Sequence, residues 1–345
     1  MALRRMPPPL AISMGDPAGI GPEVILKAAA QLARKRPAPA LVVIGDLGAM
    51  RAAAQRLGSV PEPYAFEPEN LTNRRAAALP VLKSSELSAA AIRPGAPSVE
   101  GAKAAYEYIV AGARMALSGE ASGLVTAPIN KEWLNRAGFR FAGHSELLAK
   151  ISRTRLWRMM FAGDQLKLVL VTVHVGLARV SRMLNRERVL QTIRLIDEHL
   201  RSEMGIARPR LGVLGFNPHA GENGLFGNEE IRAITPAVES ARRAGIDAHG
   251  PIPPDTAFIR HSGMFGFDAA VAMYHDQGLI ALKTLEFDRA VNVTLGLPIV
   301  RTSPDHGTAY DIAGTGKASP DSMIAAIDYA WRAAMRRQQK ALRAA

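Results

Sequence analysis

Short apolar runs alternate with helix-like segments along most of this chain. Runs rich in branched aliphatic residues predict strands at 10–14, 41–44, 123–126, 166–173 and 210–216. Apolar residues at helical spacing predict helices at 24–34, 47–57 and 99–117. Regular alternation of strands and helices is typical of an α/β protein with a mostly parallel sheet and helices on both faces.

Polar side chains that suit an anionic ligand gather between residues 271 and 317. His275 follows one apolar run, Asn292 lies within a second, and Arg301 follows a third. Lys283 adds another cation to the same stretch. Because ligands bind at the carboxyl ends of strands in open α/β sheets, this composition predicts a site for a small anionic substrate.

Three histidines stand just after apolar strand-like runs: His174, His219 and His275. Neutral imidazole is the commonest metal-binding side chain, and parallel strands bring their carboxyl ends to one edge of a sheet. A site of three histidines without thiolate leaves coordination positions open for substrate, which is typical of a catalytic metal. The alternative is that each is an ordinary structural histidine. His199 lies among polar neighbours in a helical segment and is expected to be solvated.

Two glycine-containing segments precede predicted helices. The segment Gly143–Ala149 places His144 and Ser145 at a helix start, where free N–H groups and the helix dipole favour an anion. Ser145 can equally be a helix cap, with His144 on the surface. The loop Gly15–Val24 is neither a dinucleotide-binding fingerprint nor a P-loop, and its glycines can equally serve a tight strand-to-helix turn.

Composition narrows the class of protein. A chain of 345 residues with 48% hydrophobic residues suits a globular protein of two domains. It has no cysteine, so disulfides and thiolate metal sites are excluded. No apolar run reaches the roughly 18 residues of a membrane helix and no signal peptide is recognisable, so a cytoplasmic location is expected. The net charge of +12 leaves nucleic-acid binding as an alternative, although no aromatic stacking motif, zinc finger or dense basic run accompanies it.

Seven segments spread over nearly the whole chain carry the most specific motifs. They read M-G-D-P-A-G-I-G-P-E (14–23), V-T-A-P-I-N-K (125–131), G-H-S-E (143–146), N-P-H-A-G-E (217–222), M-Y-H-D-Q-G-L (273–279), V-N-V-T-L-G-L-P (291–298) and R-T-S-P-D-H-G-T-A-Y-D-I-A-G-T-G (301–316). In this order they resemble the 4-hydroxythreonine-4-phosphate dehydrogenase family of pyridoxal phosphate biosynthesis. Parts of them are also similar to the wider isocitrate and isopropylmalate dehydrogenase superfamily.

The resemblance implies two three-layer α/β domains with a cleft between them, as in isocitrate and isopropylmalate dehydrogenases and unlike the Rossmann fold. The first domain would comprise residues 1–127 and 281–345, on the nucleotide side. The second would comprise residues 128–280, with the metal ligands and the dimer interface. The resemblance also implies a homodimer whose active site lies at the subunit interface, with neither a nucleic acid nor a membrane as partner.

The same resemblance implies roles for individual residues. The metal ligands correspond to His174, His219 and His275, and the one at the position of His174 comes from the partner subunit. The substrate contacts correspond to His144, Ser145, Lys283, Asn292 and Arg301. The family commonly has threonine at the position of Ser145, and serine keeps the hydroxyl. The loop of His306 and Gly307 is similar to the adenosine-binding loop of the superfamily.

The implied reaction is the NAD- or NADP-dependent oxidation of 4-phosphohydroxy-L-threonine, a small phosphorylated amino acid. One divalent metal per site would act as a Lewis acid, with zinc favoured and cobalt, magnesium or manganese as alternatives. The resulting 3-keto acid would lose carbon dioxide and give 3-amino-2-oxopropyl phosphate. Asp255 is the candidate base, and its alternative role is to cap a following helix. A paralogue that oxidises a phosphorylated threonate or erythronate would share these motifs.

Overall fold

The computed structural model describes residues 7–35, 37–67, 78–141, 143–260, 262–286 and 289–344. The chain packs as two compact units. Unit 1 comprises Met1–Arg155 and Leu297–Ala345, and unit 2 comprises Leu156–Gly296. The domain boundaries expected from the sequence, after residues 127 and 280, lie earlier in the chain than the boundaries of these units.

Unit 1 is built on parallel strands in the order β3-β4-β2-β1-β5-β12. The strands are β1 (Leu10–Ser13), β2 (Leu41–Asp46), β3 (Glu62–Ala65), β4 (Ala78–Ser85), β5 (Gly123–Thr126) and β12 (Arg301–Pro304). The helices are α1 (Gly21–Leu32), α2 (Leu47–Leu57), α3 (Val99–Ser118), α4 (Lys131–Arg136), α5 (His144–Ile151) and α10 (Asp321–Ala344).

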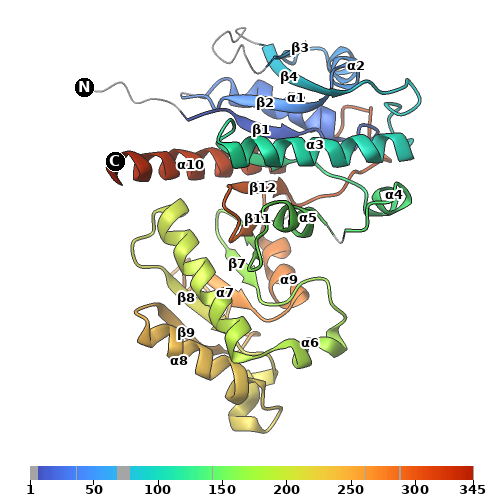
Figure 1. The fold of residues 1–345 in the computed structure, drawn as a ribbon. Helices are drawn as coiled ribbons and strands as arrows, with labels where there is room; N and C mark the ends of the chain where they lie inside the picture. Colours follow the sequence, from blue (N-terminus) through green and yellow to red (C-terminus); the bar gives the residue numbers. More distant parts are fainter. Residues whose placement is uncertain are drawn as a thin grey trace. The chain divides into compact units, whose positions relative to one another are not determined.

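Helices cover both faces of the unit 1 sheet. Helix α3 packs on β1, β2 and β5, whereas α10 packs on β1, β5 and β12 and contacts α1. In Figure 1 the red C-terminal helix α10 thus belongs with the blue N-terminal strands. Gly112 lets α3 approach the sheet closely, because a Cβ there would lie 2.6 Å from Leu124 of β5. Strands β1 and β5 are buried throughout, as expected of a parallel sheet between two helical layers.

Unit 2 has the strand order β11-β6-β7-β10-β8-β9, antiparallel at β11–β6–β7 and parallel from β7 onward. The strands are β6 (Arg158–Ala162), β7 (Lys167–Leu170), β8 (Arg210–Leu214), β9 (Asp247–Ile252), β10 (Ala269–Ala272) and β11 (Val291–Leu295). The helices are α6 (Leu177–Met183), α7 (Arg186–His199), α8 (Thr235–Arg243) and α9 (His275–Glu286), with short helical segments η2 (Leu200–Met204), η3 (Pro218–Gly224) and η4 (Glu230–Ile234). Helices α7 and α9 both pack on β7 and β10 but not on each other, so they form opposite layers.

The α/β class predicted from the sequence is confirmed, with three layers in each unit. The solvated position expected for His199 is wrong. The residue is 7% exposed, and its Nδ1 lies 3.6 Å from a carboxylate oxygen of Glu203, which is 9% exposed. Both residues face the packed side of their helical segments, which polar sequence neighbours do not reveal. None of the described helices is long and apolar enough to cross a membrane.

Candidate active site

Three histidines lie beyond the carboxyl ends of three neighbouring parallel strands of unit 2. Strand β10 pairs in parallel with β7 on one side and with β8 on the other. His174, His275 and His219 follow the last residues of β7, β10 and β8 by four, three and five positions. The fold therefore carries all three to one edge of the sheet, the edge at which α/β proteins bind ligands.

Two of these histidines are close neighbours within one chain. The ring centroids of His174 and His275 are 6.1 Å apart. The ring of His219 instead lies 6.0 Å from that of Phe226. Among the residues that the structure describes, no group of three or more histidine, cysteine, aspartate or glutamate side chains could hold a metal ion.

Hydrogen bonds hold the strand extensions side by side. The hydroxyl of Thr172 donates to the carbonyl of Met273 at 2.7 Å, which joins the segment before His174 to the segment before His275. Gln277 accepts from the N–H of Met273 and donates to the carbonyl of Gly215 just beyond β8, each at 2.6 Å. The three strand ends are thus connected by two buried or half-buried polar side chains.

The histidines themselves have features common at metal sites. His275 uses Nδ1 for a 2.6 Å hydrogen bond with Asp276, which leaves Nε2 for a metal. His174 and His219 have left-handed backbones, with φ of 48° and 51°. Such conformations cost non-glycine residues roughly 1–3 kcal/mol and are concentrated at functional sites.

A second candidate region, in unit 1, centres on Arg301. This residue opens β12, is only 2% exposed, and donates from Nη2 to the hydroxyl of Thr126 at 2.7 Å. Burial lowers the pKa of Arg301 to about 9, although the negative charge of Glu146 opposes the shift. The guanidinium is therefore still protonated at neutral pH. A desolvated arginine is well suited to binding phosphate or carboxylate.

His144 and Ser145 open α5, as the sequence predicts. Ser145 is only 2% exposed, and no side-chain hydrogen bond caps the helix, so Ser145 is not its N-cap. Burial, followed by the positive charges of Arg301 and Lys131, holds the pKa of His144 well below its ordinary value of 6.5. The imidazole is therefore neutral, and its buried Nε2 has no hydrogen-bond partner among the described residues. The structure thus brings together His144 and Arg301, two of the predicted substrate contacts.

The remaining predicted residues are placed less tightly. Lys283 is half-buried on α9, eight positions after His275, and Asn292 is half-buried within β11. Asp255 is exposed in the turn at 254–258. Residues 253–260 form no helix, so the alternative role of Asp255 as a helix cap is wrong.

The loop of His306 and Gly307 packs against the glycine loop that follows β1. Ile20 donates its N–H to the carbonyl of Thr308 at 3.0 Å. A Cβ on Gly19 would lie 3.0 Å from the same carbonyl oxygen, so glycine permits this close approach. The two loops therefore form one continuous surface within unit 1.

Sequence reasoning missed the role of Asp16 in this surface. Its carboxylate is 2% exposed and accepts from the N–H of Ala18 at 2.9 Å and the hydroxyl of Tyr310 at 2.6 Å. Burial raises the pKa of Asp16 above its ordinary value despite these hydrogen bonds. The available signal was an aspartate directly beyond a strand end in a glycine-rich loop.

The family model of the pyridoxal phosphate biosynthetic protein PdxA matches residues 37–330. This chain belongs to the PdxA family.

Relatives in the PdxA family agree along almost the whole chain. Proteins named 4-hydroxythreonine-4-phosphate dehydrogenase from Geobacter metallireducens and Maricaulis maris are each 48% identical, covering 93% of this chain and 94% and 96% of theirs. A crystal structure of 4-hydroxythreonine-4-phosphate dehydrogenase from Klebsiella pneumoniae matches with a TM-score of 0.82 and 42% identity, over 95% of this chain and 99% of that one. The PdxA resemblance seen in the seven motifs is therefore confirmed.

Proposed function

We propose that this chain is an NAD(P)- and metal-dependent 4-hydroxythreonine-4-phosphate dehydrogenase of pyridoxal phosphate biosynthesis. Membership of the PdxA family supports the reaction and its phosphorylated substrate. The observation that carries the metal requirement is the edge of unit 2, to which three neighbouring parallel strands deliver His174, His219 and His275.

His174, His219 and His275 would hold one divalent ion, with zinc favoured by three nitrogen donors. Cobalt, magnesium and manganese are the alternatives. When bound, the ion supplies Lewis acidity that lowers the pKa of the substrate hydroxyl. The Asp276 carboxylate beside Nδ1 of His275 would orient that ring toward the ion.

The substrate is anionic, and buried or half-buried polar groups would bind it. Arg301 would hold its phosphate or carboxylate, together with Lys283 and the hydroxyl of Ser145. Neutral His144 would accept a hydrogen bond at Nε2, and Asn292 would donate one from its amide. These contacts position the substrate and exclude water from its charged groups.

The oxidation moves two electrons and two protons. The hydroxyl proton passes to a base, for which Asp255 is the candidate, and the C3 hydrogen leaves as hydride to the nicotinamide. The 3-keto acid then releases its carboxylate as carbon dioxide, and the carbon left behind takes up a proton to give 3-amino-2-oxopropyl phosphate. The surface formed by the loops of Asp16 and His306–Gly307 would bind the adenosine side of NAD or NADP.

A metal-dependence assay tests this proposal. The protein is stripped with chelator, and absorbance at 340 nm is followed with 4-phosphohydroxy-L-threonine and NAD or NADP as single metals are restored. The expected result is turnover only with metal. Metal binding without turnover, combined with a higher kcat/KM for a phosphorylated threonate or erythronate, would reassign the substrate. Neither binding nor turnover would contradict the proposal.

The same proposal includes a homodimer in the cytoplasm. The family resemblance supports the dimer, with the ligand at the position of His174 supplied by the second chain. The absence of cysteine suits a reducing compartment.

A further inference from the structure

The turn that carries His219 has a costly backbone. From His219 to Asn223 five consecutive residues have positive φ, between 41° and 82°. Only Gly221 among them is glycine. Because each non-glycine residue in this conformation costs roughly 1–2 kcal/mol, the turn needs specific contacts to hold it.

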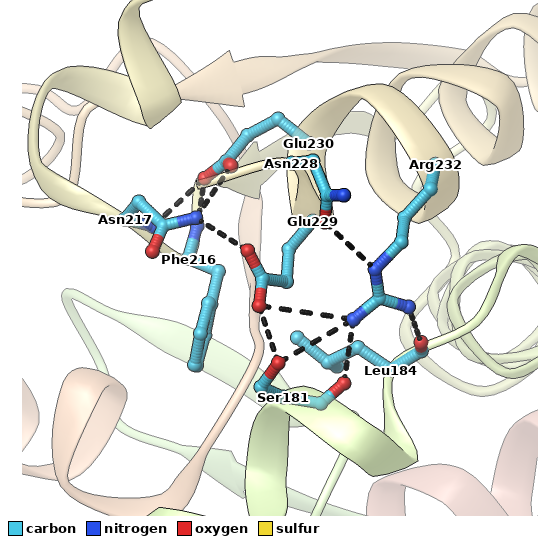
Figure 2. A network of polar contacts seen from close by, with 8 residues as sticks. All are labelled: Ser181, Leu184, Phe216, Asn217, Asn228, Glu229, Glu230 and Arg232. Atoms are coloured by element: carbon cyan, nitrogen blue, oxygen red, sulfur yellow. Dashed lines mark hydrogen bonds and ion pairs between the residues drawn. The ribbon is translucent and has the colours of Figure 1, made fainter. Parts of the chain in front are cut away.

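A buried carboxylate provides such contacts (Figure 2). Glu230 is 3% exposed, and its Oε1 accepts the N–H groups of Phe216 and Asn217 at 2.7 and 2.8 Å. Its Oε2 accepts from the side-chain amide of Asn217 at 2.8 Å. A Cβ on Gly221 would lie 2.6 Å from the same Oε2, so glycine lets the turn pack directly on this carboxylate.

The neighbouring carboxylate connects the turn to helix α6, which begins three residues after His174. Glu229 accepts from the side-chain amide of Asn217 at 2.9 Å. Its other oxygen accepts from the hydroxyl of Ser181 on α6. A single pair of adjacent residues, Glu229 and Glu230, therefore contacts the residues that precede the turn of His219 and the helix that follows His174.

Arg232 completes this network, as Figure 2 shows. It donates to the carbonyls of Ser181 and Leu184, at 2.7 and 2.6 Å, at the end of α6. Its guanidinium lies 3.7 Å from the carboxylate of Glu229. The end of α6 and the turn of His219 are thus anchored to one short segment, Glu229–Arg232.

We propose that Glu230, assisted by Glu229, is a positioning residue for metal binding: it holds His219 in its left-handed turn and fixes that turn to the segment following His174. This inference rests on the proposed function, because a metal site is what makes the position of His219 matter chemically. Glu230 acts through the backbone of residues 216 and 217 and contacts neither metal nor substrate in this scheme.

The test compares Glu230→Gln with a matched control, Glu286→Gln. Glutamine keeps one acceptor oxygen but turns the other into an amide donor, which faces the amide donor of Asn217. Glu286 is a similar carboxylate elsewhere in unit 2. It is 9% exposed and accepts three backbone N–H groups, of Asp164, Gln165 and Leu166, at 2.6–2.8 Å between β6 and β7.

The readouts are the Zn²⁺ affinity, measured by competition with a chelator, and hydrogen exchange of residues 216–226. We expect Glu230→Gln to weaken Zn²⁺ binding by about tenfold or more, in the range found for groups that orient metal ligands, and to speed exchange in the turn. Glu286→Gln should keep Zn²⁺ affinity within about twofold. Equal losses in both variants, or unchanged affinity in Glu230→Gln, would overturn the inference.

A milder variant keeps the test decisive if Glu230→Gln does not fold. Ser181→Ala removes one hydrogen bond to Glu229 and should weaken Zn²⁺ binding by about two- to tenfold. Unchanged affinity there would count against the inference. Wild-type Zn²⁺ binding without turnover would remove the proposed substrate yet leave the Glu230 comparison intact. Turnover by the wild type, together with unchanged Zn²⁺ affinity in Glu230→Gln, would keep the proposed function and overturn the role of Glu230.

Discussion

The two candidate regions prepare their side chains by opposite means. In unit 1, Arg301 and Ser145 are each 2% exposed, and burial lowers the pKa of both Arg301 and His144. In unit 2, the side chain of His275 is 43% exposed, and His174 and His219 are also exposed. There the preparation lies in backbone conformation and in hydrogen bonds around the turns.

This difference follows from what each region would bind. An anion is held most strongly by a cation that has already lost its water, because charge–charge attraction grows as the local dielectric falls. A metal ion instead needs neutral, accessible nitrogen donors at fixed positions. Burial of the side chains therefore prepares unit 1 to bind an anion, and fixed positions of the histidines prepare unit 2 to bind a metal ion.

The largest effect is expected at the exposed histidines. His219→Ala should abolish metal binding at the site and lower turnover by more than about 100-fold, beyond the range for groups that only orient ligands. The fold should survive because the side chain is exposed. Metal content and absorbance at 340 nm measure the effect. His249→Ala, at an exposed histidine of β9, is the control and should retain both. Full metal occupancy in His219→Ala would refute the ligand role.

Mixing two inactive variants sharpens the assignment of ligands to chains. If the ligand at His174 comes from the second chain of a dimer, His174→Ala and His219→Ala together form mixed dimers with one intact site. Half of the dimers are then mixed, so activity should return to about a quarter of the wild-type value. The two purified variants are unfolded and refolded together, and the dehydrogenase activity of the mixture is measured. No recovery, with mixed dimers demonstrated, would place both ligands in one chain.

In unit 1 the corresponding substitution is Arg301→Ala. Loss of a charged hydrogen bond to substrate should raise KM for the phosphorylated substrate by about 10- to 100-fold and leave KM for NAD nearly unchanged. The control is Arg158→Ala, which removes a partly buried arginine of β6 whose pKa burial lowers to about 10 and whose Nε donates to Thr192. Equal changes in both KM values would show that Arg301 does not bind substrate.

Burial in unit 1 also predicts a pH dependence. The pKa of His144 in the folded state lies below its ordinary 6.5, so folding favours the neutral ring. This contribution to stability is fully present above pH 6.5 and is lost as pH falls toward the folded pKa. The free energy of unfolding, measured with denaturant, should therefore fall more steeply for wild type than for His144→Gln as the pH is lowered from about 6.5 to 5. The difference in slope should be at most about 1.4 kcal/mol per pH unit. Parallel curves would contradict the buried neutral state.

The smallest effect is expected for Ser145→Thr. Threonine keeps the hydroxyl and adds one methyl group at a position that is 2% exposed. KM for the phosphorylated substrate should change by less than about threefold. A change beyond about tenfold would mean that the buried site of Ser145 is too tightly packed for the family's more common residue.

The local pattern of apolar residues was enough to predict the helices and strands whose buried positions are themselves apolar. Helix α2 has the predicted bounds, and β1, β5 and β8 lie where apolar runs predict them. The same logic located the three strand-end histidines. It failed for β12, because the sequence Arg301–Pro304 is polar yet fully buried, and no hydrophobic pattern marks such a strand.

The hydrogen-bond partners of buried polar side chains were not predictable from the sequence alone. Asp16 and Tyr310 are 294 positions apart, and nothing local indicates their hydrogen bond. Glu229 and Glu230 resemble a solvated pair on a helix in sequence, yet their oxygens accept from backbone and side-chain N–H groups of residues 216 and 217. These bonds depend on a turn whose left-handed backbone only the folded context makes acceptable.

The position of α10 has a consequence for how the protein is made. Strands β1 and β5 need α10 to cover them, so unit 1 cannot complete its core until α10 has emerged from the ribosome. Unit 2 is continuous in sequence and meets no such delay. At synthesis rates of about 5–20 residues per second, the interval between β5 and α10 is on the order of ten seconds. The nascent chain therefore carries a finished histidine-bearing unit while its first strands still await their cover.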